Sequence, residues 1–130
     1  MNTLFNPPTL SKPVGFSHAV KASGAMVFLA GQIGCDASGK ILSPGDMVGQ
    51  FRQTLTNLQI AITDAGGEMT SIVKLTIFVT SKQLYKANLK KIGSVYQEFF
   101  GKYYPAMTLA ELSSLYEDEA LIEIEGIAVI

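Results

Sequence analysis

The side chains best suited to chemistry lie where strand-like segments mix polar with large apolar residues. They are Gln32, Thr108, Glu111, Glu123 and Glu125. A carboxyl group enclosed in an apolar cleft is driven towards its protonated form by desolvation, so it can donate or accept a proton in a reaction. The setting of Glu123 and Glu125 fits that role. It also fits two carboxylates that are solvated or paired with a neighbouring strand.

The sequence lacks the residues and motifs of several other common kinds of catalytic site. It has one histidine and one cysteine, too few for a zinc site of the usual type. It contains neither a G-x-x-x-x-G-K-[ST] phosphate loop nor a G-x-G-x-x-G helix start. His18 has no recognisable triad partners, and Cys35 lies in a loop without neighbours that would activate a thiol. We therefore expect no metal, no cofactor and no catalytic role for either residue.

The composition indicates a globular chain that buries much of its surface. Of its 130 residues, 48% are hydrophobic and 16% are charged, against about 25% charged in typical domains. So low a charge content favours surface buried in an oligomer. The net charge of −1 and the scattered lysines offer no electrostatic footprint for nucleic acid. The only arginine, Arg52, falls in a helical segment, where we expect a surface or structural position.

The N-terminal sequence MNTLFNPPTLSKP lacks a charged segment followed by an apolar one, so it predicts no signal peptide. No apolar run approaches the ~18 residues that a membrane-spanning helix needs. We therefore expect a soluble, cytoplasmic protein that binds neither membrane nor nucleic acid.

The elements that must position the polar residues are predicted in the order β-β-α-β-α-β-β, after an extended arm at residues 1–14. Alternating apolar residues mark strands, and recurrence at three- or four-residue steps marks helices. Ser43 is expected to cap the first helix and Gly66-Gly67 to end it. A turn at Ser23-Gly24 is expected to join the first two strands as a hairpin. The predicted elements are strands at residues 16–22 and 26–33, a helix between Ser43 and Gly66, a strand at 72–80, a helix from Ser81 to about residue 100, and strands at 106–113 and 120–129.

The two faces of the last predicted strand differ in composition. Ile122, Ile124 and Ala128 share an apolar face suited to a core, because side chains alternate along a strand. The opposite face carries Glu123 and Glu125 among large apolar residues, an unusual composition for a sheet surface in water. The sequence therefore predicts a single α+β domain over residues 1–130, with two helices on one sheet face and the other face buried by self-association.

Alternation in the strand at residues 26–33 makes a further prediction. It places Gly31 on the same face as Val27 and Leu29, and Ala30 with Gln32 on the other.

Six segments of this chain, in the right order, resemble the RidA/YjgF family of reactive-intermediate imine deaminases, often labelled endoribonuclease L-PSP. The resemblance implies a chorismate-mutase-like α+β fold that forms a homotrimeric barrel, with a small-molecule ligand bound between subunits. It also implies a reaction in which water adds to an imine or enamine and ammonia is released. The segments are AGQIG at residues 30–34, FRQTLTNLQIAITDAGG at 51–67, IVKLTIFV at 72–79, YQEFF at 96–100, PAMTLAEL at 105–112 and IEIEGIAV at 122–129.

The resemblance also implies site residues, and several of them depart from the family pattern. Glu123 is the implied catalytic residue, helping to position the attacking water. Met107 stands where deaminases of the family have an arginine that forks onto the substrate carboxylate. Gly31 and Gln32 match the pattern. The implied substrate-binding positions are Ser17, Ala30, Gly31, Gln32, Gly93, Met107, Thr108 and Leu109, of which Ser17, Ala30, Gly93 and Leu109 replace the family's usual tyrosine, serine, asparagine and cysteine.

Three functions remain open from these residues. The first is a deaminase-type hydrolase for a less anionic and more apolar substrate, with Met107 lining a changed pocket. The second is a catalytically silent trimer that binds a small molecule or a protein, with Met107 merely filling space. The third, a ribonuclease, is the least favoured, because the sequence offers neither a phosphate grip nor a histidine pair.

Overall fold

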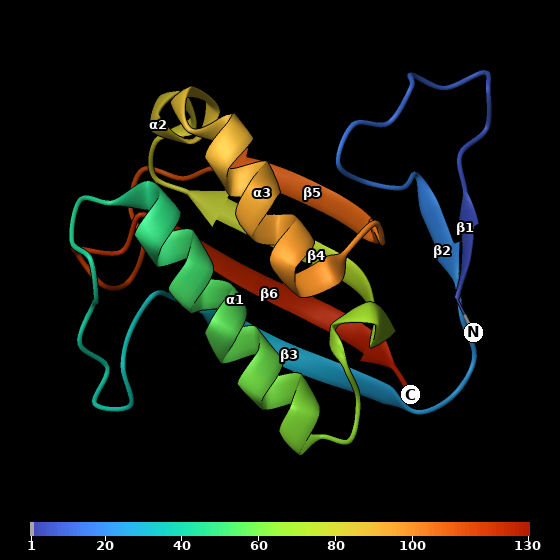
Figure 1. Cartoon of the computed structure of the whole chain (residues 1–130), viewed down its shortest axis with the longest axis horizontal. Coiled ribbons are helices and arrows are strands. Elements are labelled where there is room, and N and C mark those ends of the chain that lie inside the picture. Colours follow the sequence, from blue (N-terminus) through green and yellow to red (C-terminus); the bar gives the residue numbers. More distant parts are fainter. Residues whose placement is uncertain (1) are drawn as a thin grey trace.

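The computed structural model describes residues 2–130 as an α+β fold in which two layers of helix and sheet enclose the core (Figure 1). The main sheet has the strand order β3-β6-β4-β5. The expected fold class, with the helices on one face of a sheet, is confirmed. The elements are β1 Thr3–Phe5, β2 Ala19–Lys21, β3 Met26–Gln32, α1 Met47–Asp64, the 3-10 turn Met69–Ser71, β4 Ile72–Val79, α2 Lys82–Ala87, α3 Leu89–Phe100, β5 Ala106–Glu111 and β6 Ile122–Val129.

The two C-terminal strands form as expected but do not pair with each other. β6 is antiparallel to both β3 and β4, whereas β5 is parallel to β4 and lies at the sheet edge. The loop after β5 therefore carries the chain past β4 before β6 begins. Two strands that follow one another in sequence need not be neighbours, because the loop between them can span another strand.

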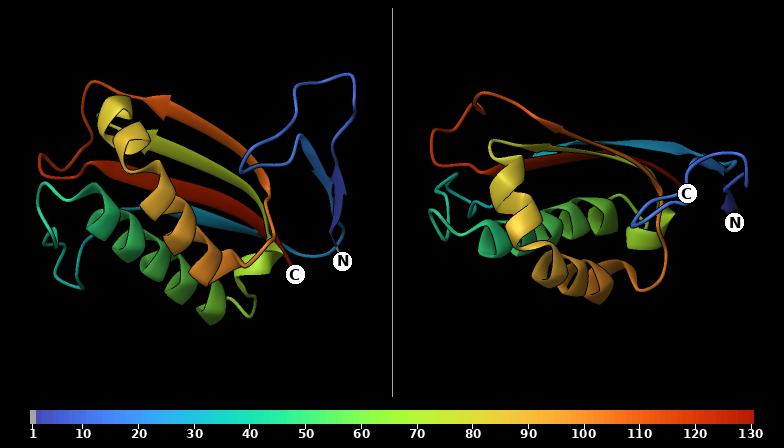
Figure 2. Two further views of the ribbon diagram at one scale, coloured as in Figure 1. Left: turned by 45° about the horizontal axis from the view of Figure 1, so that its top comes forward. Right: turned by 90° about the horizontal axis from the view of Figure 1, so that it is seen from above.

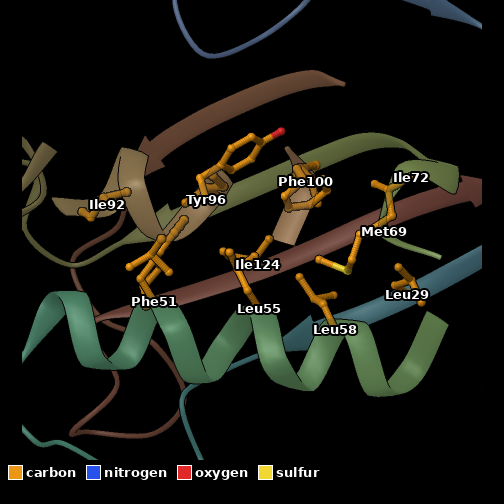
Figure 3. Packing of buried hydrophobic residues seen from close by; sticks show 14 of the residues in the cluster. Leu29, Phe51, Leu55, Leu58, Met69, Ile72, Ile92, Tyr96, Phe100 and Ile124 are labelled. Atoms are coloured by element: carbon orange, nitrogen blue, oxygen red, sulfur yellow. The ribbon is translucent and has the colours of Figure 1, made fainter. Parts of the chain in front are cut away.

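The core lies between the sheet and the two long helices. Ile122 and Ile124 of β6 have no exposed surface, and Leu55 and Leu58 of α1 are equally buried against them at 1% and 0% exposure. Figure 3 shows side chains from α1, α3 and the sheet meeting in this layer. The apolar face predicted for the last strand is therefore confirmed, and α1 buries residues at the three- and four-residue steps expected of a helix.

The first helix begins later than expected. Asp46, not Ser43, is its cap: the Asp46 carboxylate accepts a hydrogen bond from the Gly49 backbone N–H at 3.0 Å. Ser43 has a φ of 55° and so cannot start a helix. A carboxylate satisfies the free N–H groups of a first turn as well as a hydroxyl does, and the geometry of the loop decided between them. The expected end is confirmed, with Gly66 at a φ of 92°.

The single second helix that the sequence predicts is divided into two helices, α2 and α3, in the structure. Ser81 caps α2 as expected, since its hydroxyl oxygen accepts from the Leu84 N–H at 3.0 Å. The chain then breaks at Asn88, whose φ of −111° lies outside the helical range. The Asn88 side chain donates to the Leu84 carbonyl at 2.9 Å, which satisfies an acceptor at the end of α2. The apolar stripe continued across this break, so periodicity could not reveal it.

The expected hairpin between the first two strands is wrong. β2 pairs with β1 in a separate two-stranded sheet, and β3 pairs with β6. Figure 1 shows β1 and β2 standing apart from the main sheet, beyond the start of β5. The outer edge of β3 is consequently without a partner strand among residues 2–130. We call the segment of residues 2–21 the N-terminal arm.

The sheet face opposite the helices is bare. Seen from above in Figure 2, α1 and α3 lie on the same side of the sheet, and no helix or strand of residues 2–130 covers the other side. Phe28 is 71% exposed and Met26 59% exposed there, on β3. Within residues 2–130, no helix has the length and apolarity needed to cross a membrane.

Candidate functional site

A largely apolar cavity of about 560 Å³ lies between α3, the edge strand β5 and the N-terminal arm. That volume is in the range of small-molecule sites. Its walls come from parts of the chain that are far apart in sequence. The lining residues are Val14, Gly15, Phe16, Phe51, Ile77, Tyr85, Leu89, Ile92, Gly93, Tyr96, Gln97, Tyr104, Met107 and Leu109.

Three of the predicted binding residues line this cavity. Met107 and Leu109 pair with Leu75 and Ile77 of β4, which are core residues, so both point to the helix side of the sheet. Met107 packs on the core and also borders the cavity, so it fills space and lines a pocket at once. Gly93 faces them from α3, and a methyl group added there would meet no atom within 4 Å.

Ser17 has a different position from the one expected of a ligand-binding residue. Its side chain is buried and donates a hydrogen bond to the Tyr104 carbonyl at 2.6 Å, while its backbone N–H donates to the Pro105 carbonyl at 3.0 Å. The hydroxyl therefore ties the arm to the start of β5. The residues just before it, Val14 to Phe16, form the cavity wall.

Glu123 and Gly31 meet on the opposite face of the sheet. A methyl group added at Gly31 would overlap the Glu123 carboxylate, so the side chain lies directly over the glycine. The expected grouping of Gly31 with Leu29 is wrong, because a bulge between Leu29 and Gln32 shifts the alternation. Within residues 2–130, no hydrogen bond to a protein group occupies the Glu123 carboxylate.

Three predicted positions remain: Ala30, Thr108 and Gln32. Ala30 is exposed beside Gly31. Thr108 lies between the two cavity residues of β5 and so points away from the cavity; its hydroxyl accepts a hydrogen bond from the Lys74 ammonium at 2.8 Å. Gln32 pairs with Ile124, and its amide nitrogen lies 3.4 Å from the Ala30 carbonyl oxygen.

The predicted site residues thus form two groups on opposite faces of one sheet. We call Gly93, Met107 and Leu109 the cavity group, and Ala30, Gly31, Thr108 and Glu123 the open-face group. One chain alone cannot bring the two groups into contact, because the sheet separates them.

The other two carboxylates singled out from the sequence are placed outside both groups. Glu111 accepts a hydrogen bond from the Lys82 N–H at 2.8 Å, at the start of α2. Anions are favoured there by the helix dipole, so its position has a structural explanation. Glu125 is exposed opposite Thr76.

Arg52 is on the surface, as expected. Its guanidinium forks onto the Glu98 carboxylate at 2.7 and 2.9 Å, between α1 and α3. The hydrogen bond from Arg52 lowers the pKa of the Glu98 carboxyl. The arginine does not line the cavity, so it is no substitute for the charge missing at Met107.

His18 serves to hold the arm, since its ring nitrogen Nε2 lies 2.7 Å from the Ser11 carbonyl oxygen. Across residues 2–130, no three His, Cys, Asp or Glu side chains come together as metal ligands.

Sequence reasoning missed the aromatic walls of the cavity. The helical spacing of apolar residues brings Tyr85 and Tyr96 to the buried side of α2 and α3, where they also line the cavity. Burial raises the pKa of the Tyr85 hydroxyl to about 12 and raises that of Tyr96 as well. The ring of Tyr104 stacks on Tyr96, with centroids 5.1 Å apart. No spacing rule predicts Tyr104, because only folding brings it to α3.

The family model described as endoribonuclease L-PSP matches residues 9–130. The chain is 37% identical over 118 residues to a RutC family protein of Pyrococcus horikoshii, a match that covers 90% of this chain and 89% of that protein. It is 30% identical over 128 residues to the 2-iminobutanoate/2-iminopropanoate deaminase of Dermatophagoides farinae, covering 98% and 95%. The solved structure of the Rid-family protein YyfB from Yersinia pestis is 32% identical, with a TM-score of 0.90 over 99% of this chain and 98% of that one.

Proposed function

Because the chain belongs to the endoribonuclease L-PSP family, also called RidA/YjgF, we propose that it is a homotrimer whose intersubunit clefts hydrolyse an imine or enamine. Each subunit contributes one domain of residues 1–130. The cavity group of one subunit meets the open-face group of the next. Support comes from the separation of the two groups within one chain and from the bare face that carries Phe28 and Met26.

The proposed reaction needs only water as co-substrate. Glu123 accepts a proton from water as the water oxygen bonds to the imine carbon, and the electron pair of the C=N bond moves to nitrogen. The nitrogen takes up protons, the C–N bond breaks, and ammonia leaves as the carbonyl forms. An enamine first takes a proton on carbon to become the imine.

The observation that carries this proposal is the position of the Glu123 carboxylate over Gly31. Within residues 2–130 it has no hydrogen-bonding partner in its own chain, and the residue is half-buried on a face that an apolar partner subunit would cover. A carboxylate with free lone pairs in such a place can orient and deprotonate water.

Met107 restricts the charge of the substrates that the cavity can bind. Binding a carboxylate in this cavity would bury a negative charge without a cation, since no charged side chain lines it. The relative in Dermatophagoides is named for 2-iminobutanoate and 2-iminopropanoate, which are small imino acids. We propose that this chain acts poorly on such anions and prefers uncharged imines.

The test is ammonia release from benzophenone imine, a neutral imine, and from 2-iminopropanoate generated in the assay. We expect faster turnover of the neutral imine, and Glu123→Gln should lower kcat by about a hundredfold. Glu125→Gln is the matched control, since it removes the same charge two residues along the same face. Equal loss in both variants, or no loss in Glu123→Gln, would remove the assigned role of Glu123.

A silent ligand-binding trimer is the second candidate, favoured by the replacement of the clamping arginine with Met107. It predicts ligand binding in the cavity with no ammonia from any imine. A ribonuclease is the least favoured, because the net charge is −1 and the single arginine is paired with Glu98.

A further inference from the structure

Building on the proposed function, we propose that the cavity beneath Gly93 takes an uncharged aromatic group, so that the ligand of this site is a neutral, aryl-bearing molecule. The inference names the ligand class of the same site. Three observations carry it: the charge of the cavity wall, the open space at Gly93, and the aromatic rings that surround that space.

The cavity wall is uncharged throughout. None of the residues that border it is Asp, Glu, Lys, Arg or His. The phenol of Tyr85, which forms part of this wall, has its pKa raised by burial, so the surroundings already disfavour a negative charge. A ligand carboxylate would meet the same unfavourable surroundings, whereas a neutral ring would not.

Gly93 creates the space that such a ring would occupy. It is an exposed residue of α3, and apart from its own helix backbone and chain neighbours no atom lies within 4 Å of where a side chain would begin. Leu89 and Tyr96 flank it on the same face of the helix, at spacings of four and three residues. A glycine in a helix interior is otherwise unfavourable, so its presence here is best explained by the room it leaves.

Aromatic side chains border this space on several sides. Tyr85 and Tyr96 come from the helices, Tyr104 from the approach to β5, and Phe16 from the arm. Flat faces and edges of this kind suit a planar ring. The Gln97 amide makes only a long contact, 3.4 Å from the Tyr104 hydroxyl, and so retains capacity to bind a neutral carbonyl or imine nitrogen.

The test uses two fluorescent compounds with one scaffold. N-phenyl-1-naphthylamine is neutral, and 8-anilino-1-naphthalenesulfonate adds one negative charge. Titrated against the full-length protein, the neutral compound should bind once per chain and at least about tenfold more tightly than the sulfonate. Equal or tighter binding of the sulfonate would overturn the proposal.

Variants locate the binding. Gly93→Leu should weaken the neutral compound about tenfold or more while the melting temperature stays level or rises, because the new side chain fills the cavity and removes a helix glycine. Ser94→Leu adds the same side chain on the exposed side of the same helix and should change affinity less than about twofold. If Gly93→Leu does not fold, Gly93→Ala provides the same test with a smaller expected loss of affinity. If a folded Gly93 variant bound N-phenyl-1-naphthylamine with unchanged affinity, the proposal would be wrong.

Met107→Arg tests the charge argument from the other side. It should reverse the preference, so that the sulfonate binds more tightly than the neutral compound. These measurements need no turnover. If the binding pattern holds and no imine is hydrolysed, the proposed function fails alone. If imines are hydrolysed and the neutral compound does not bind, the ligand class fails alone.

Discussion

At the scale of single residues, the contact between Gly31 and Glu123 links backbone geometry to chemistry. The bulge in β3 turns Gly31 towards the open face, and the absent side chain leaves room for the carboxylate. A glycine at this position is therefore explained by the space that Glu123 occupies, and under the proposed function Gly31 would act through Glu123 as a positioning residue.

Gly31→Ala should consequently lower imine hydrolysis about as much as Glu123→Gln does. The methyl group would displace the carboxylate, which is the far end of a flexible side chain, so the melting temperature should change little. The variant that combines Gly31→Ala with Glu123→Gln should have a kcat no lower than Glu123→Gln alone, since both changes act through the Glu123 carboxylate. Additive losses in kcat would show that Gly31 has a separate role.

Tyr85 connects burial to stability at high pH. Its pKa is raised from 10.0 to about 12 because burial disfavours the phenolate. A raised pKa means that the stabilisation is fully present below the unfolded value and is lost as the pH rises through the folded one. The free energy of unfolding, measured by urea at pH 9 and pH 11, should therefore fall more in the wild type than in Tyr85→Phe. If the free energy of unfolding fell equally in the wild type and in Tyr85→Phe, ionisation of Tyr85 would not be the cause of the loss of stability.

At the scale of elements, the N-terminal arm forms part of the cavity wall although its two strands lie apart from the main sheet. Ser17 bonds to the backbone at Tyr104 and Pro105, and the Asn2 side-chain amide donates to the Thr70 carbonyl at 3.1 Å and to the Tyr103 hydroxyl at 3.0 Å. Most residues between these two anchors are exposed, with Val14 at 83%. Elements with few buried contacts open at low free-energy cost.

Ser17→Ala should loosen the arm without unfolding the main sheet. The change removes a buried hydrogen bond, leaving the Tyr104 carbonyl without its donor, a loss of about 1–3 kcal/mol that falls mainly on the arm. Hydrogen exchange should speed up across residues 3–21, and the affinity for N-phenyl-1-naphthylamine should fall. Thr9→Ala, at an exposed arm position, is the control. Unchanged exchange in the Ser17 variant would contradict the anchoring role.

At the scale of the whole molecule, the bare sheet face decides whether a functional site exists at all. Phe28, at 71% exposure, is the most exposed large apolar side chain on that face. Burying it in a subunit interface would contribute roughly 1.5–3 kcal/mol per subunit. The same association would bring Glu123 of one copy to the cavity of another.

Phe28→Asp should therefore shift the proposed trimer towards monomers and abolish the proposed hydrolysis, while each chain stays folded. Sedimentation velocity measures the assembly and circular dichroism the fold. Ile60→Asp is the matched control, because Ile60 is also well exposed, at 64%, but on the outer side of α1. A wild-type protein that sediments as a monomer would remove the basis of the proposed site.

Local patterns were enough to predict the four strands of the main sheet and its long helices, the core face of β6 and the glycine stop at Gly66, but they missed β1 and the break between α2 and α3. Each of these predictions depends on whether a side chain prefers water or apolar surroundings, and that preference follows from the residue type at each position. The candidate site residues were chosen from motifs along the chain, and three of them, Gly93, Met107 and Leu109, line the cavity.

Tertiary structure alone decided which strands pair, where the Gly31 bulge turns the backbone, and on which side of the sheet each candidate lies. It also buried a polar residue that no pattern marks: Gln50 has no exposed surface and bonds to the backbone of Glu119 and Leu121. Hydrogen-bond partners and cavity walls come from segments that are distant in sequence. Such contacts depend on how the whole chain packs, so the preferences of neighbouring residues leave them undetermined.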